Sequence, residues 1–256
     1  MDTIIRHARL RGCQGTRDMG ITNGRIAVVA EHLTEEATTE VDAAGNLVMP
    51  TYVNGHIHLD KCFLQEQMRP NKDYTFGECL ELTWEHKARY TTEDIVERAG
   101  RAIQEGILNG TTVFRAFADV DSIGKLRGVE GLLALRERWR DVALIEVVAF
   151  PQEGIIRDPG TDELLEEAMR LGADVVGGLP WFELLDEDAR AHIDVCFALA
   201  RRYEKDIHML VDDTDNPLSR SLEYLAVKTL REGYQSRVSA SHCGALGHRS
   251  SNREKH

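Results

Sequence analysis

The fold is decided by the stretch TYVNGHIHLDK, residues 51–61, in which two histidines stand two apart at the end of an apolar run typical of a strand. Side chains alternate between the faces of a strand, so His56 and His58 point the same way, about 6.5 Å apart along the backbone. Two imidazoles on one face can hold a divalent cation such as zinc or iron, provided that other residues complete the ligand set. The alternative is that one histidine caps a loop and the other packs in the core.

The rest of the chain alternates between predicted helices and predicted strands. We expect helices near residues 92–108, 122–140, 161–171, 186–203 and 217–232, and strands near 111–119, 143–152, 174–180, 206–213 and 237–243. Such alternation predicts right-handed βαβ units and a parallel sheet, either closed into a barrel or open and doubly wound. Runs such as VVAF at 147–150 are apolar throughout, as in strands covered on both faces.

Polar residues gather where the predicted strands end. In a (β/α) barrel the carboxyl ends of the strands form the catalytic face. The residues that we expect to open onto one mouth are His56, His58, Gln152, Asp212, Asp213 and His242. The segment 65–90 follows the first of these strands and is long enough to act as a lid, although a packed insertion with a solvated face is the alternative.

The chain resembles the cytosine deaminase branch of the amidohydrolase superfamily from about Gly45 to His242. The stretches that carry the likeness are VNGHIHLDK at 53–61, VVAFPQEG at 147–154 with LGADVVG at 171–177, and SASH at 239–242. The resemblance implies a metal-dependent barrel hydrolase that uses water to break a carbon–nitrogen bond of a small heterocycle or amide.

The resemblance also implies roles for five residues. His56 and His58 correspond to metal ligands of the first strand, and Gln152 to a residue that hydrogen-bonds the substrate ring, since a carboxamide offers both a donor and an acceptor. His242 corresponds to a histidine that polarises or deprotonates the water, and Asp213 stands where the family has an acid/base glutamate. The alternatives are a turn residue for Gln152, a helix cap for Asp213, and a packed or capping histidine for His242.

Two features depart from the family pattern. Where the family has a metal-binding histidine, three residues before the acid/base carboxylate, this chain has Leu210. His208 lies on the same face two residues earlier, and we expect it to be about 6.5 Å deeper, too far away to replace that ligand. The family continues through two more strand–helix units, with an aspartate ligand on the eighth strand, whereas residues 247–256 here are polar and lack periodicity.

We therefore expect an α/β fold: an incomplete TIM-like (β/α) barrel of about six of eight units over residues 51–246. Part of a small β domain precedes it at 1–50, and an irregular polar tail follows at 247–256, as in a truncated product. Six strands cannot close an eight-stranded barrel, so open edges should favour self-association as a homo-oligomer. The predicted function is cytosine deaminase-like hydrolysis of a non-peptide carbon–nitrogen bond, feeble in this chain by itself. The alternative is a non-catalytic remnant with weak or no metal binding.

Composition agrees with an enzyme that has a small-molecule substrate. The 256 residues are 42% hydrophobic, which is enough for a sizeable core, and the net charge of −12 argues against nucleic acid or an anionic membrane as a partner. No apolar run approaches the roughly 20 residues of a membrane span, and the N-terminus lacks a signal-peptide profile, so we expect a cytoplasmic protein. Five cysteines without a CxxC pair predict neither a disulfide framework nor a cysteine zinc site.

Overall fold

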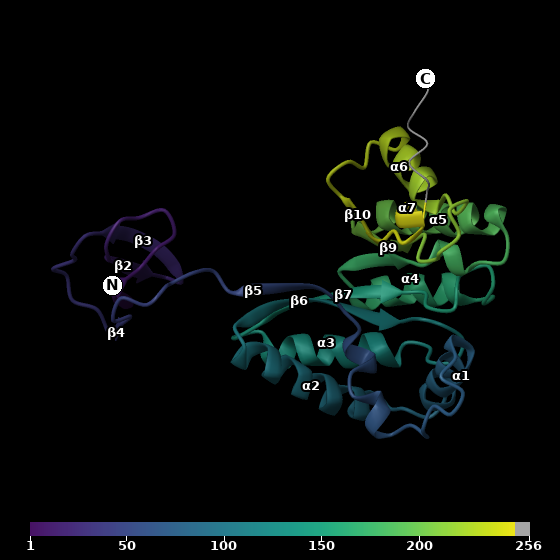
Figure 1. The fold of residues 1–256 in the computed structure, drawn as a ribbon, viewed down its shortest axis with the longest axis horizontal. Coiled ribbons are helices and arrows are strands. Elements are labelled where there is room, and N and C mark those ends of the chain that lie inside the picture. The colour runs from purple at the N-terminus through teal and green to yellow at the C-terminus, as the bar shows by residue number, and fades with distance from the viewer. Residues whose placement is uncertain (249–256) are drawn as a thin grey trace. The chain divides into compact units, whose positions relative to one another are not determined.

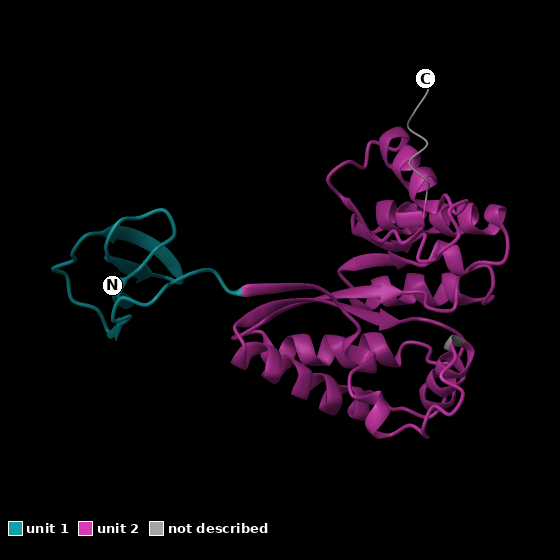
Figure 2. Cartoon of the chain, viewed as in Figure 1, with its two compact units in different colours: residues 1–51 teal, residues 52–256 magenta. Residues whose placement is uncertain are grey.

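The computed structural model describes residues 1–248, with Phe76 described by its backbone alone. The chain divides into two compact units, Met1–Thr51 and Tyr52–His256, which Figure 2 shows in different colours. No helix among the described residues is long and apolar enough to span a membrane. The predicted tail at 247–256 starts inside a short helix, α7 (Ala245–His248), and residues 249–256 lie outside the described part.

The first unit is a four-stranded sheet in the order β3-β2-β1-β4. Its strands are β1 (Thr3–Ala8), β2 (Arg17–Thr22), β3 (Arg25–Ala30) and β4 (Thr39–Asp42). Asn23 and Gly24 join β2 to β3 with positive φ angles of 52° and 70°. These are the two residue types that tolerate the left-handed conformation of a tight hairpin turn, so the sequence fixes this hairpin locally.

The second unit contains a six-stranded parallel sheet in the order β10-β9-β8-β7-β6-β5. Its strands are β5 (Tyr52–Ile57), β6 (Thr111–Asp119), β7 (Leu144–Phe150), β8 (Val175–Gly178), β9 (Asp206–Val211) and β10 (Val238–His242). A doubly wound sheet reverses its order at a switch point, whereas this one follows the chain from edge to edge. The strand order therefore decides for barrel-type winding (Figure 1).

Five helices follow the strands in turn and pack on one face of the sheet (Figure 1). They are α2 (Thr92–Leu108), α3 (Arg127–Trp139), α4 (Thr161–Leu171), α5 (Asp186–Arg202) and α6 (Ser221–Arg231). Alternate strand residues, such as Ala116 and Val147, join the core beneath these helices. Their neighbours Phe117 and Val148 belong to a second buried cluster on the opposite face, and Leu210 is part of that cluster. The covered faces explain why the strand sequences are apolar throughout.

Between β5 and α2 the chain forms an insert of two short 3-10 helices and a longer helix. These are η1 (Leu59–Lys61), η2 (Leu64–Glu66) and α1 (Phe76–Lys87); a third 3-10 helix, η3 (Pro180–Phe182), follows β8. Thr75 caps α1 by accepting a hydrogen bond from the Glu78 amide, as capping threonines do. The helix ends on Lys87, whose side chain is almost fully buried.

Two helices begin later than the sequence predicts. The expected helix at 122–140 starts at Arg127, because Asp121 Oδ1 accepts from the amides of Ile123 and Gly124 and holds a turn there. The helix expected from residue 217 starts at Ser221, whose amide and hydroxyl both donate to Asp212. In each case an aspartate side chain competes with the helix for backbone donors.

Candidate active site

His56 and His58 lie together at the end of β5, as their spacing predicts. Their ring centroids are 5.1 Å apart, and both rings contact Phe117, at 4.3 and 5.3 Å between centroids. The Nδ1 atoms of both rings are buried, and neither has a hydrogen-bond partner among the described residues. Burial lowers the pKa of His56, with help from His242, and lowers that of His58 well below its usual range. Both imidazoles are therefore neutral at pH 7, the form that ligates metals.

His242 and His208 join these rings from the far strands of the sheet, and the four residues form what we call the histidine group. The His242 ring centroid lies 5.2 Å from that of His56, and the His208 centroid lies 6.1 Å from it. This distance between ring centroids does not measure depth, so the expectation that His208 lies too deep to replace a ligand at Leu210 stays a prediction. Strands of a barrel are tilted and staggered, so counting residues back from a strand end does not measure depth between non-adjacent strands.

His208 nevertheless has partners for both ring nitrogens. Arg115 lies 3.3 Å from Nδ1, and Ser241 Oγ lies 3.1 Å from Nε2. Burial, together with the Arg115 charge, lowers the pKa of His208 to about 4. Both ring nitrogens of His208 are therefore engaged, and one of these contacts would have to be exchanged before the ring could bind a cation.

A second polar cluster, which we call the lysine network, lies at the ends of β6 and β7 and consists of Lys61, Lys87, Asp119, Asp121 and Glu153. Asp119 binds both lysines, with its Oδ1 at 2.6 Å from Lys61 Nζ and its Oδ2 at 2.8 Å from Lys87 Nζ. Lys87 Nζ also lies 2.7 Å from Asp121 and 3.0 Å from Glu153. Although burial alone would lower it, these three carboxylates hold the pKa of Lys87 well above its usual value. The lysine network is therefore charged and internally paired.

Asp60 lies between the two clusters and is fully buried. Its Oδ2 accepts a hydrogen bond of 2.8 Å from the Asp119 amide, while its Oδ1 has no hydrogen-bond partner in the described part of the chain. Burial, reinforced by the Asp119 charge, raises the pKa of Asp60 to about 7. Ligand atoms of His58, Asp60 and Asp119 lie within 4.8 Å of one another, so this set could also contact a cation. Asp119, however, already neutralises two ammonium groups.

Gln152 follows β7 and contacts the lysine network directly. Its Oε1 accepts a hydrogen bond of 2.8 Å from Lys61 Nζ. Its backbone N–H donates a hydrogen bond of 2.9 Å to the carbonyl oxygen of Phe150, so the residue also makes a tight turn, as the alternative interpretation expected. The two interpretations are compatible, because the turn uses the backbone and leaves the side chain to other contacts.

The two aspartates that follow β9 have different environments. Asp212 is buried with φ of 49°, and its Oδ1 accepts from Ser219 Oγ at 2.7 Å and from the Ser221 amide at 2.8 Å. Asp212 therefore fixes the loop that leads into α6, as a helix-capping residue does. Asp213 is exposed, and its Oδ2 lies 3.9 Å from His242 Nε2. The structure thus brings Asp213 near the histidine group.

The sequence analysis assigned no role to Lys61, Lys87 or Asp119. Asp119 stands at the end of an apolar strand, as His58 does, and Asp121 follows it at the same two-residue spacing. That spacing was a usable signal for polar side chains at the mouth. Lys87 offered no such signal, because its partners come from 34 and 66 residues further along the chain.

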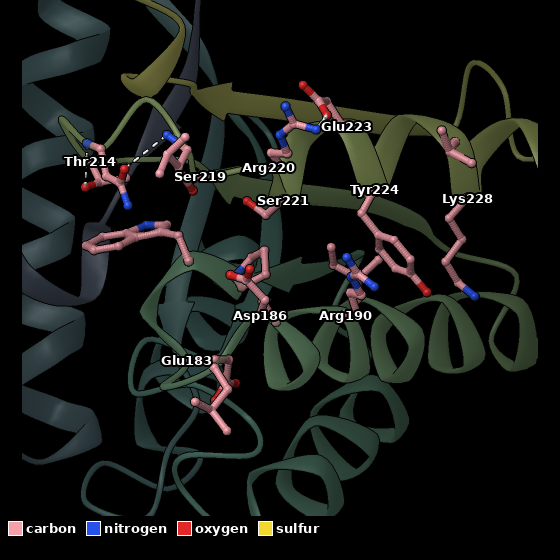
Figure 3. Close-up of a pocket in the computed structure, with 18 of the residues that line it drawn as sticks. Glu183, Asp186, Arg190, Thr214, Ser219, Arg220, Ser221, Glu223, Tyr224 and Lys228 are labelled. Atoms are coloured by element: carbon pink, nitrogen blue, oxygen red, sulfur yellow. Dashed lines mark hydrogen bonds and ion pairs between the residues drawn. The ribbon is translucent and has the colours of Figure 1, made fainter. Parts of the chain in front are cut away.

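A separate hollow lies between η3, α5, α6 and the loop after β9 (Figure 3). Its volume is about 1040 Å³, and its lining includes Glu183, Arg190, Arg220, Tyr224 and Lys228. None of the residues predicted for the site lines it. Charged side chains of its lining have partners within the chain: Lys228 pairs with Asp194 at 2.8 Å, and the buried side chain of Glu183 pairs with His192 at 2.7 Å.

Comparison with known proteins bears on both fold and family. An N-isopropylammelide isopropyl amidohydrolase from Pseudomonas sp. (strain ADP) is 33% identical over 245 residues, which are 94% of this chain and 60% of that protein. The crystal structure of 5-methylcytosine deaminase from Klebsiella pneumoniae liganded with 5-fluorocytosine matches with a TM-score of 0.86 and 33% identity, covering 95% of this chain and 59% of that one. N-isopropylammelide isopropylaminohydrolase from Burkholderia multivorans ATCC 17616 matches with a TM-score of 0.84 and 29% identity, covering 96% and 62%.

The chain therefore spans about 60% of the length of these relatives. Their structures confirm the predicted incomplete (β/α) barrel with an additional small sheet. The model of the amidohydrolase family matches residues 80–255, more than half of the chain. The chain belongs to the amidohydrolase family.

Proposed function

We propose that this protein hydrolyses a non-peptide carbon–nitrogen bond of a small nitrogen heterocycle, in the manner of a cytosine deaminase. The observation that carries the proposal is the convergence of histidines from the ends of β5 and β10, together with a half-buried Gln152 that follows β7. Relatives with about a third of residues identical include a 5-methylcytosine deaminase and an N-isopropylammelide isopropyl amidohydrolase. These support a cytosine-like or triazine-like ring as the substrate.

We propose His56 and His58 as ligands of a divalent cation, zinc or iron. Their neutral imidazoles and the buried Nδ1 atoms without partners suit such an ion, which prefers nitrogen donors at about 2.0–2.1 Å in the case of zinc. A cation of this kind lowers the pKa of water from about 15.7 toward about 7, so that hydroxide is available near neutral pH.

The other roles are assigned to side chains around this pair. Asp213 Oδ2 can take a proton from water and return it to the leaving nitrogen, and His242 Nε2, 3.9 Å away, can share that proton. Gln152 hydrogen-bonds the ring. The alternative of a non-catalytic remnant is not favoured, because four histidines converge at the site and the relatives are deaminases and amidohydrolases. Cytoplasmic location and self-association stay predictions.

Metal binding is the first test of this proposal. Purified protein loaded with zinc or iron should retain less metal when His56 and His58 are both changed to alanine, measured by elemental analysis after desalting. The matched control changes His7 and His32, which are exposed in the first unit, and should retain the metal of the unchanged protein. Equal metal content in both double variants would contradict the assignment.

Turnover is the second test. Ammonia release from cytosine, 5-methylcytosine and amino-triazines should depend on added metal and should disappear in Asp213→Ala, even where the rate is feeble. The exposed Asp215→Ala serves as the control, because Asp215 pairs with His248 rather than His242. Metal-dependent turnover that persists in Asp213→Ala would exclude Asp213 as the acid/base group.

A further inference from the structure

A row of polar contacts links β6 to the histidine group. Arg115 Nη1 lies 3.3 Å from His208 Nδ1, and His208 Nε2 lies 3.1 Å from Ser241 Oγ. The same hydroxyl lies 3.3 Å from His242 Nδ1, and His242 Nε2 faces Asp213 Oδ2 at 3.9 Å. These contacts form what we call the hydrogen-bonded row, which runs from β6 through β9 to the end of β10.

Arg115 sets the direction of the hydrogen bonds at its end of the row. A guanidinium group has N–H donors and no acceptor, and it stays charged in proteins. Nδ1 of His208 is therefore the acceptor and carries no proton, while Nε2 carries the N–H that donates to Ser241 Oγ. Glu146 accepts from Arg115 Nε and holds the guanidinium group in this position.

Ser241 transmits this direction to His242. A hydroxyl has one donor and two acceptor lone pairs, so accepting from His208 leaves Ser241 able either to donate to His242 Nδ1 or to accept from it. Two contacts favour donation. The hydrogen bonds of the described residues give the Ser241 hydroxyl hydrogen no acceptor other than His242 Nδ1, and the Asp213 carboxylate, which has acceptors only, faces His242 Nε2. With the proton on Nε2, each group in the row therefore meets a complementary group.

We infer that Arg115 is a positioning residue that acts through His208 and Ser241 to hold His242 in the tautomer with its proton on Nε2. The inference rests on the proposed function, in which His242 and Asp213 act together, and it gives the two side chains different tasks. An imidazole with a proton on Nε2 donates a hydrogen bond from that atom and cannot take a proton there. The proton of the water is therefore left to the exposed carboxylate of Asp213.

The test observes the tautomers directly, in the full chain labelled with ¹⁵N at histidine. Long-range ¹H–¹⁵N correlation spectra distinguish a ring nitrogen that carries a proton from one that does not, because the latter resonates far downfield. The spectra are recorded in chelator, so that the result does not depend on the proposed metal, and at about pH 8.5, where a histidine of ordinary pKa is neutral. In the unchanged protein, His208 and His242 should each show a single tautomer, with the proton on Nε2.

Variants at two points of the row have different expected results. Arg115→Met removes the donor that holds His208, so both His208 and His242 should become mixtures of two tautomers. Ser241→Ala interrupts the row further on, so His242 should become a mixture while His208, which still faces Arg115, keeps one tautomer. Arg115→Lys retains a charged group with donors only, and Ser241→Thr retains the hydroxyl, so each should keep the single tautomers.

The control is Arg140→Met, which removes an exposed arginine paired with Glu137 and should leave both imidazoles unaltered. Circular dichroism verifies the fold of each variant, and Ser241→Ala tests the row by itself if Arg115→Met does not fold. A proton on His242 Nδ1 in the unchanged protein would overturn the inference, and so would a tautomer of His242 that neither variant alters. Both results would leave the proposed function intact, whereas the expected tautomers without metal-dependent turnover would contradict the proposed function alone.

Discussion

The lysine network and the histidine group both bury polar side chains, but they differ in whether the buried polar atoms have partners. The lysine network pairs every ammonium with carboxylates of the chain itself, and Asp119 alone contacts two lysines. The histidine group instead leaves the buried Nδ1 atoms of His56 and His58 without a partner among the described residues. A buried polar atom without a hydrogen bond costs about 1–3 kcal/mol.

This difference separates residues that stabilise the fold from residues that are available to bind a ligand. The lysine network ties β5, β6, β7 and α1 to one another and orients Gln152, so it is part of the framework. Three members of the histidine group pack against Phe117, and two of them, His56 and His58, keep a buried Nδ1 atom without a partner among the described residues. We expect substitutions in the lysine network to affect folding and those of unpartnered histidines to affect ligand binding. Four experiments test this distinction.

Removal of the Lys87 charge should have the largest effect. Lys87→Met leaves Asp121 and Glu153 buried without their shared cation, and one-sided removal of a buried ion pair costs about 3–5 kcal/mol of the free energy of unfolding. Urea unfolding followed by circular dichroism measures the loss. The exposed Lys72→Met should stay within about 0.5 kcal/mol of the unchanged protein. Similar midpoints for both variants would mean that the lysine network is not part of the framework.

The fold was largely predictable because its signals are local. Period-two and helical patterns placed α2, β6 and α4 at the residues where they occur. Helix starts were less predictable where an aspartate side chain redirects the backbone, as Asp121 does before α3. The alternation of strands and helices left the choice between barrel and doubly wound sheet open, because it depends on which strands pair and not on where each strand lies. The family resemblance is what favoured the barrel.

The candidate site was predictable in part. The convergence of His56, His58 and His242 followed from their positions at strand ends, and the structure brings them together. The expectation about His208 stays a prediction, because depth along one strand does not measure depth in the barrel. Lys87 could not be found, because a lysine in the last turn of a helix is ordinarily solvated, and only tertiary packing places it among three carboxylates.

The same distinction can be tested within one loop, between the adjacent residues Asp212 and Asp213. Asp212→Ala removes the acceptor of Ser219 and Ser221 and should cost about 1–3 kcal/mol, whereas Asp213→Ala, at an exposed position, should cost at most about 0.5 kcal/mol. Asp212→Asn keeps an accepting oxygen and tolerates the positive φ, so it should retain most of the stability. Thermal unfolding of the three variants measures this. A larger loss in Asp213→Ala than in Asp212→Ala would reverse the assignment of framework and chemistry.

A smaller effect, at most about 1.4 kcal/mol per pH unit, is expected from the titration of His208. Its pKa is about 4 in the folded protein and about 6.5 when unfolded, so the unfolded chain binds more protons between these values. The contribution of His208 to stability is therefore complete above pH 6.5 and is lost as the pH falls toward 4. Asp60 has a raised pKa, so its titration acts in the opposite sense and favours the folded protein as the pH falls. The effect of His208 must therefore be measured as a difference between two proteins.

Urea unfolding at several pH values gives the free energy of unfolding of the unchanged protein and of His208→Gln, both in the presence of a metal chelator. The difference between the two free energies is compared across the pH values. Between pH 6.5 and pH 4, the free energy of unfolding of the unchanged protein should fall by up to about 1.4 kcal/mol per pH unit more than that of the variant. Parallel pH profiles would show that His208 is solvated and would place it outside the buried part of the histidine group.

The smallest effect on folding, and the sharpest contrast with Lys87, is expected at His58. His58→Leu replaces a ring whose buried Nδ1 lacks a partner with an apolar side chain, so the packing that is lost and the desolvation that is relieved should nearly cancel, leaving a change within about 1 kcal/mol in chelator. Added zinc should raise the unfolding temperature of the unchanged protein, because a ligand that binds the folded state stabilises it by mass action, and should have little effect on the variant. Calorimetry with and without zinc measures both quantities. A loss in chelator as large as that of Lys87→Met would show that His58 belongs to the framework, and the distinction between the two sides of the site would then fail where it is strongest.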